Sequence, residues 1–94
     1  MSAVSHTAPF SLLPNYPNPF NPTTTISFAL GLDGPTRMTI YDASGRRVAT
    51  LIDGYMTPGK YQIEWDASGY ASGLYYYRLE SGDWTKTNTM ILRK

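Results

Sequence analysis

The sequence predicts an all-β protein, an immunoglobulin-like antiparallel β-sandwich of about seven strands. Apolar and polar residues alternate over most of the chain, which is the period of a half-buried strand. β-Branched and aromatic residues fill these runs, and glycine, proline and aspartate between them favour turns. The 94 residues leave room for one small core. A small barrel is the structural alternative.

The chain begins with a polar leader, residues 1–8, and we expect the folded domain to span residues 9–94. The leader has neither the basic nor the apolar region of a signal peptide, so any export signal would lie on a larger parent chain. Phe10–Leu13 is long enough for one short edge strand. No apolar run approaches the length of a transmembrane helix.

Residues 14–22 form a proline-rich segment, which we call the proline ribbon. Its four prolines lack backbone donors and bias the residues before them towards extended conformations, which excludes a helix or a central strand. We expect a stiff, kinked segment with Tyr16 and Phe20 as its apolar anchors.

Alternating runs and turn residues then follow each other to the end of the chain. The expected strands cover residues 26–30, 38–41, 48–52, 61–65, 74–79 and 84–92. The expected turns cover residues 32–35, 42–45, 58–59, 66–69 and 81–83. Gly45 is free to take a positive φ, and each aspartate at a turn can bond the backbone two residues on. The predicted core comprises Ile26, Phe28, Met38, Ile40, Val48, Ile63, Trp65, Tyr75, Tyr77, Leu79, Met90 and Leu92.

Composition excludes several classes of function. The chain has no cysteine, so it holds no disulfide, thiol nucleophile or cysteine-based zinc site. Its net charge of +1 and scattered basic residues give no support to nucleic-acid binding. The single histidine, His6, lies in the leader, where we expect it to be exposed rather than part of a catalytic triad. We therefore predict no enzymatic activity, no cofactor and no metal site, while a calcium ion between two loops stays an alternative.

Aromatic residues suggest one further alternative, a carbohydrate-binding module. Tyr55, Tyr70, Tyr76 and Trp84 are the candidates for stacking against sugar rings. They lie on different predicted elements, so a weak glycan site would require these elements to bring them together.

Several segments, taken together and in order, resemble a known family, the type IX secretion C-terminal sorting domain. This family is related to the immunoglobulin-like domain of flagellar hook-capping proteins. The resemblance covers residues 12–94. It is carried by Asn15–Pro22, Thr23–Phe28, Ile40–Val48, Trp65–Asp66, Ala71–Leu79 and Met90–Lys94.

The resemblance implies a non-catalytic last module of a secreted protein. The parent would reach the periplasm, an outer-membrane translocon would recognise the module, and a surface sortase would remove it, leaving the parent on the cell surface. The candidate recognition residues are Pro17, Asn18, Pro19, Phe20, Asn21, Pro22, Gly73, Leu74, Tyr75, Arg93 and Lys94. Many members carry a lysine pair where this chain has Asn88-Thr89, with Lys86 as the nearest substitute.

Each candidate group also has a structural interpretation. The proline ribbon can cover a sheet edge and block strand addition. Gly73 can use a positive φ to enter a central strand whose tyrosine, Tyr75, fills the core. We expect the last strand to pair to about Leu92, with Arg93 and Lys94 projecting beyond the core as a basic terminus. A structural spacer without a ligand is the remaining alternative function.

Overall fold

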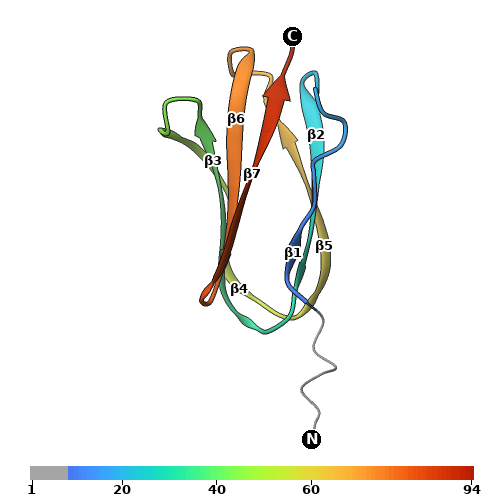
Figure 1. Cartoon of the computed structure of the whole chain (residues 1–94), viewed down its shortest axis with the longest axis vertical. Coiled ribbons are helices and arrows are strands. Elements are labelled where there is room, and N and C mark those ends of the chain that lie inside the picture. Colours follow the sequence, from blue (N-terminus) through green and yellow to red (C-terminus); the bar gives the residue numbers. More distant parts are fainter. Residues whose placement is uncertain (1–8) are drawn as a thin grey trace, which may run out of the picture.

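The computed structural model describes residues 9–94, so the expectations for the leader 1–8 and for His6 lie outside the described residues. Within 9–94 the chain is all β, with seven strands and no helix (Figure 1). The strands are β1 (Ser11–Leu12), β2 (Thr23–Leu30), β3 (Gly34–Asp42), β4 (Arg47–Met56), β5 (Gly59–Asp66), β6 (Gly73–Ser81) and β7 (Trp84–Leu92).

The strands form two antiparallel sheets that face each other. One sheet has the order β1-β2-β5 and the other the order β4-β3-β6-β7. Figure 1 shows the two sheets as separate layers, with the C-terminus at one end of the long axis and β1 towards the other. This arrangement confirms the predicted sandwich, and the barrel alternative does not apply because the sheets do not close on each other.

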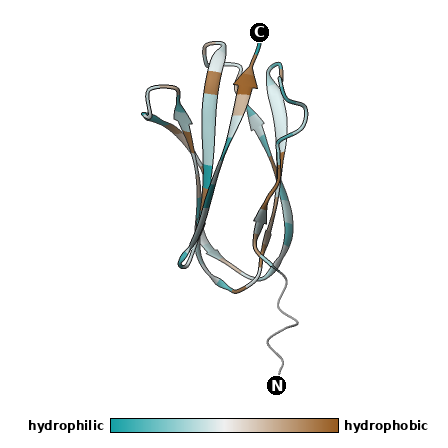
Figure 2. Cartoon of the chain, viewed as in Figure 1, coloured by the Kyte–Doolittle hydropathy of each residue, from teal (hydrophilic) through white to brown (hydrophobic). Residues whose placement is uncertain are grey.

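The core lies between the two sheets and contains most of the predicted residues. Ten of the twelve are buried, whereas Val48 and Ile63 are only half-buried and pack against the core. Both exceptions lie on strands at a sheet edge, β4 and β5, where no further strand covers the side chain. Figure 2 shows the resulting alternation of hydrophobic and hydrophilic bands along the strands. Additional buried hydrophobic residues are Leu12, Phe20, Leu30 and Ala67.

Turn chemistry follows the sequence-based expectation. Gly45 and Gly82 have φ values of 89° and 57°, in the left-handed region that favours glycine. The two Asp-Ala-Ser-Gly copies use the same local bond: Asp42 Oδ1 accepts from the Ser44 N–H at 3.0 Å, and Asp66 Oδ1 accepts from the Ser68 N–H at 2.9 Å. Both copies of the tetrapeptide therefore form the same side-chain-to-backbone hydrogen bond in their turns.

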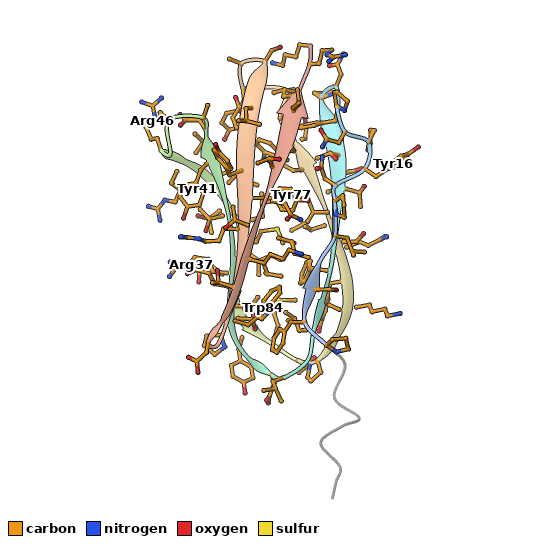
Figure 3. All side chains as sticks on the ribbon, viewed as in Figure 1. Tyr16, Arg37, Tyr41, Arg46, Tyr77 and Trp84 are labelled. Atoms are coloured by element: carbon orange, nitrogen blue, oxygen red, sulfur yellow. The ribbon has the colours of Figure 1, made fainter. Side chains whose placement is uncertain are left out.

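The prediction that Tyr16 anchors the proline ribbon is wrong. Tyr16 exchanges two backbone hydrogen bonds with Thr25 of β2, and its side chain is 81% exposed. Residues paired across antiparallel strands point to the same side of the sheet, and Thr25 alternates with the buried Thr24 and Ile26. The side chain of Tyr16 therefore points outward (Figure 3). Phe20, the other expected anchor, is buried as predicted.

Candidate functional site

The proline ribbon covers the free edge of β7 at its C-terminal end, beside Ile91 and Leu92. The Phe20 N–H donates to the Ile91 carbonyl at 3.0 Å, and the Arg93 N–H donates to the Phe20 carbonyl at 2.9 Å. Asn18 Oδ1 accepts the Ile91 N–H at 2.9 Å, so a side chain replaces one more bond of a missing strand. These bonds confirm the ribbon as an edge cover, because they occupy backbone groups on which another chain would pair.

Buried polar side chains hold the ribbon against β2. Asn15, 3% exposed, donates through Nδ2 to Thr24 Oγ1 at 2.9 Å and to the Pro17 carbonyl at 3.2 Å. The Thr24 hydroxyl donates to the same carbonyl at 2.9 Å. Sequence analysis did not single out Asn15, although a polar residue among prolines at the start of the ribbon was its signal. The conformation of Asn18 and its neighbours is therefore set by bonds on both sides of the ribbon.

Gly73 and Tyr75 have the structural roles expected of them. Gly73 has a φ of 151°, which L side chains rarely adopt, and it begins β6 opposite Leu92. Tyr75 is buried, meets the Trp65 ring edge-on at 5.7 Å, and donates its hydroxyl to the Ala71 carbonyl at 2.6 Å. Burial raises the pKa of Tyr75. Leu74 points to the other face and is 38% exposed, so its side chain is accessible to a partner.

The C-terminal residues are exposed but not free. The strand pairing ends at Leu92 as predicted, yet the Lys94 N–H donates to Ser72 Oγ at 3.0 Å. The Lys94 ammonium donates to the Ser68 carbonyl at 2.7 Å. The expectation of a projecting basic terminus is thus wrong for Lys94, because polar groups of the β5–β6 loop hold it. Hydrogen bonds from Ser68, and to a smaller extent the positive charge of Lys94, lower the pKa of Asp66.

Asn88, which stands where many family members carry a lysine, forms hydrogen bonds inside the sandwich in this chain. Asn88 Nδ2 donates to the Leu12 carbonyl at 3.2 Å and to the Tyr77 hydroxyl at 3.3 Å. The Tyr77 hydroxyl in turn donates to the Leu13 carbonyl at 2.7 Å. Asn88 therefore joins β7 to β1 across the sandwich, while Lys86 is exposed on the same strand.

All the candidate recognition residues lie at one end of the sandwich. The proline ribbon bonds to Ile91 and Arg93, β6 begins beside Leu92, and Lys94 reaches the β5–β6 loop. We call this surface, formed by the proline ribbon, residues 66–75 and residues 91–94, the C-terminal end; Figure 1 shows it at the top. Segments far apart in the sequence thus form one continuous surface.

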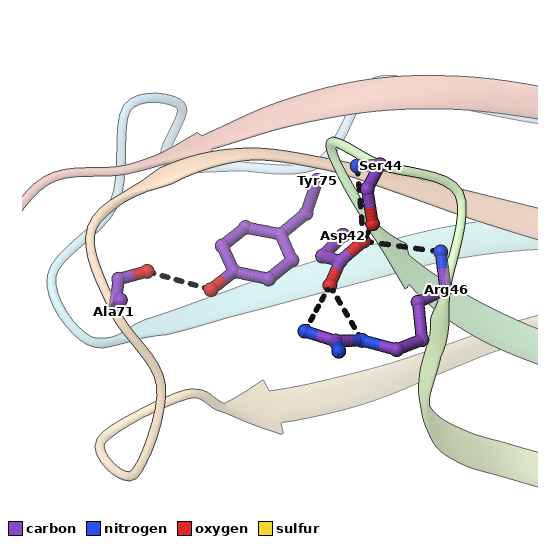
Figure 4. Close-up of polar contacts among 5 residues, drawn as sticks. All are labelled: Asp42, Ser44, Arg46, Ala71 and Tyr75. Carbon is purple, nitrogen blue, oxygen red and sulfur yellow. Dashed lines mark hydrogen bonds and ion pairs between the residues drawn. The ribbon is translucent and has the colours of Figure 1, made fainter.

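The β3–β4 turn borders the C-terminal end, and sequence analysis did not assign it a function. Asp42 is its centre: Oδ1 accepts from the Ser44 hydroxyl at 2.6 Å and the Arg46 N–H at 3.0 Å, and Oδ2 pairs with the Arg46 guanidinium at 3.2 Å (Figure 4). These hydrogen bonds, led by that of the Ser44 hydroxyl, lower the pKa of Asp42 to about 2. The Asp42 carboxylate that holds the turn is therefore ionised at neutral pH.

The aromatic candidates for glycan binding are spread over the molecule. Tyr70 packs against Trp65 at the C-terminal end, with ring centroids 5.4 Å apart, whereas Trp84 stacks on Phe10 at the opposite end. Tyr55 is exposed and donates its hydroxyl to Asp33, and Tyr76 is half-buried in the four-stranded sheet. The four rings therefore do not form one platform.

The described residues show no arrangement typical of other site types. Residues 9–94 hold no cluster of three or more histidine, aspartate or glutamate side chains placed to bind a metal ion. Over the same residues, no helix is long and apolar enough to span a bilayer.

Comparison with known proteins agrees with the resemblance seen in the sequence. The family model described as "secretion system C-terminal sorting domain" matches residues 15–93. No curated protein and no solved structure matches the chain. The matched range includes the proline ribbon from Asn15 onward, all of β2 to β7 and Arg93, which is most of the sandwich. The chain therefore belongs to the C-terminal sorting domains of the type IX secretion system.

Proposed function

We propose that the C-terminal end is the surface that the outer-membrane translocon recognises. The chain would thereby direct a parent protein from the periplasm across the outer membrane. One observation carries the proposal: the proline ribbon, Leu74 and the last two residues meet on one surface, although most of the chain separates them in sequence. A translocon that docks here reads these residues in the folded domain.

Within the ribbon, the residues available to a partner are those that point away from the core. Asn18 accepts a hydrogen bond from β7, and Pro17, Pro19 and Asn21 are exposed around it. Phe20 is buried, so it supports the surface rather than contacting a partner. A ribbon held at both ends loses little conformational entropy on binding, which favours recognition.

Family membership also supports a proposal for the steps that come after recognition by the translocon. We propose that residues 9–94 act as a non-catalytic sorting domain, that a surface sortase removes it after export, and that the parent protein stays attached to the cell surface. The family match to residues 15–93 supports this proposal. A structural spacer is the competing function, and an export assay separates the two because a spacer carries no export signal.

The test is a fusion of this chain behind a reporter with its own signal peptide, in a host with type IX secretion. We expect the intact chain to export the reporter and deletion of Arg93 and Lys94 to leave it in the periplasm. The deletion removes three hydrogen bonds of exposed groups, so the free energy of unfolding should fall by about 1 kcal/mol without unfolding the domain.

Leu32→Ala is the matched control, because Leu32 is exposed at the opposite end and should not affect export. Normal export of the two-residue deletion would contradict recognition of the tail. Retention of the reporter by the intact chain would contradict the sorting function as a whole.

A further inference from the structure

Strand β5 forms a long and regular edge of the three-stranded sheet. It pairs with β2 over its whole length without a register shift, and β2 is its only neighbour in that sheet. Within residues 9–94, no hydrogen bond joins the backbone of residues 59–66 to any element other than β2. The backbone groups on the other side of β5 are therefore available to a further strand.

The edges of β1, β4 and β7 are short, irregular or covered. β1 has two residues, and β4 carries two register shifts in its pairing with β3. The proline ribbon bonds to the C-terminal end of β7, and Asn88 of β7 donates to the Leu12 carbonyl of β1. Because short edges, bulges and covering segments hinder strand addition, β5 is the edge best suited to it.

The side of the sandwich that carries β5 is also less well covered than the other side. β1 and the proline ribbon adjoin β7 on one side, so the edge strands β4 and β5 lie on the other. Tyr61 and Ile63 of β5 and Val48 of β4 are only half-buried there and pack against the core. A strand added to β5 would shield Tyr61 and Ile63 from water.

The outward-facing side chains of β5 carry opposite charges four residues apart. Lys60, Gln62 and Glu64 are exposed and lie on the same face of the strand. Across the sheet on β2, Lys60 lies opposite Ala29 and Glu64 opposite Thr25, which are small and uncharged. Among the described residues neither charge forms an ion pair, so both can pair with another molecule.

We propose that two copies of this chain associate through antiparallel pairing of β5 with β5, about a two-fold axis at Gln62. This axis places Lys60 of each copy opposite Glu64 of the other, which gives two ion pairs across the interface. On the inner face it places Tyr61 opposite Ile63. The result is a continuous sheet of six strands, three from each copy.

Other two-fold registers fit the charges of β5 less well. An axis at Lys60 or at Glu64 sets two like charges opposite each other. An axis at Ile63 pairs Lys60 with Asp66, but the Asp66 carboxylate already accepts the Ser68 N–H at 2.9 Å. The proposed axis instead pairs two charges that have no partner within the described chain.

This pairing leaves the C-terminal end of each copy free. β5 runs from Gly59, at the opposite end of the sandwich, to Asp66 at the C-terminal end. Antiparallel copies therefore carry their C-terminal ends at the two far ends of the dimer. The dimer does not depend on the proposed sorting function and presents its recognition surface twice.

Sedimentation velocity of the 94-residue chain at increasing concentration tests the proposal, and we expect a monomer–dimer equilibrium. Each substitution changes two symmetric pairs, so Lys60→Glu and Glu64→Lys should each raise the dissociation constant at least about tenfold. The double variant restores opposite charges and should return the constant to within about threefold of the original. Lys86→Glu, exposed on β7 in the other sheet, is the matched control for net charge and should have no effect. Urea unfolding shows whether each variant is folded.

Cross-linking tests the register directly, because the chain has no cysteine of its own. The proposed axis brings Gln62 of the two copies together, with the Cβ separation of about 5 Å that opposed residues have. Mild oxidation of Gln62→Cys should therefore give a disulfide-linked dimer on a non-reducing gel. Thr87→Cys, exposed on β7, is the control for random collision and should stay mostly monomeric.

Each outcome decides the proposal. A chain that stays monomeric up to about 1 mM overturns it. An equal loss with Lys86→Glu, a double variant that does not recover, or equal cross-linking of the two cysteine variants also overturns it. A dimer that survives Glu64→Lys has a different axis, and the proposal fails. None of these measurements involves export, so the sorting function stands or falls separately.

Discussion

The two ends of the sandwich are built in different ways. At the C-terminal end, side chains bond to the backbone of segments distant in sequence, such as Asn18 to Ile91 and Ser72 to Lys94. At the opposite end, short loops join consecutive strands. The stacked rings of Phe10 and Trp84, with centroids 5.1 Å apart, cover this end of the core.

The difference between the two ends shows where the fold fixes the relative positions of loops that are distant in sequence. Backbone groups in a loop need partners, and at the C-terminal end the loops satisfy one another. Their relative positions are therefore specified, as a recognition surface requires. At the opposite end the Tyr55 hydroxyl donates to Asp33 and the Gly82 N–H donates to the Pro35 carbonyl at 3.2 Å. Among the described residues, however, no side chain of one link there bonds to the backbone of another, and Leu32 remains exposed.

The largest expected effect comes from removing the tryptophan nearest each end. Trp65 is 4% exposed and contacts Phe20, Tyr70 and Tyr75, so Trp65→Ala should lower the free energy of unfolding by about 3–5 kcal/mol. Trp84 is half-buried, so Trp84→Ala should cost about 1–2 kcal/mol. Urea unfolding measures both values. Equal losses would show that the two ends contribute alike to the core.

A smaller effect is expected from the polar support of the proline ribbon. Asn15→Ala removes two hydrogen bonds from a buried site and should cost about 1–3 kcal/mol. It should also speed hydrogen exchange at the Phe20 and Arg93 amides, which hold the ribbon to β7. Gln62→Ala, which removes an exposed 3.4 Å contact with Ser27, is the control and should cost less than about 0.5 kcal/mol. Unchanged exchange at Phe20 after Asn15→Ala would contradict the coupling.

The smallest effect concerns Asp42, whose side chain is 20% exposed. Its pKa is about 2 in the folded chain against an ordinary value of 3.8, so the ionised form is favoured by folding. The stabilisation is therefore complete above about pH 4 and is lost as the pH falls through 2. Asp42→Asn should make stability less dependent on pH between 4 and 2, measured by urea unfolding. An unchanged pH profile in this variant would show that the turn is held by other contacts.

Local sequence patterns predicted the strands and most of the core. Alternation reports which side of a strand is apolar, and this was sufficient for Ile40 and Tyr77, which lie on the inner strands β3 and β6. It overestimated burial at Val48 and Ile63, because alternation does not say whether a strand lies at a sheet edge. It also failed at Tyr16, since a proline-rich segment has no regular period from which to infer a facing side.

The sequence by itself determined the fold class, the turns and the motifs that identify the family. The tertiary structure alone decided that the proline ribbon covers β7, that Lys94 bonds to the β5–β6 loop, and that Asn88 joins the sheets. The physical reason is the separation along the sequence between the residues that interact. A side chain's preference for a turn or a strand face depends on its near neighbours, whereas the meeting of two loops depends on strand order and register, which no local segment specifies.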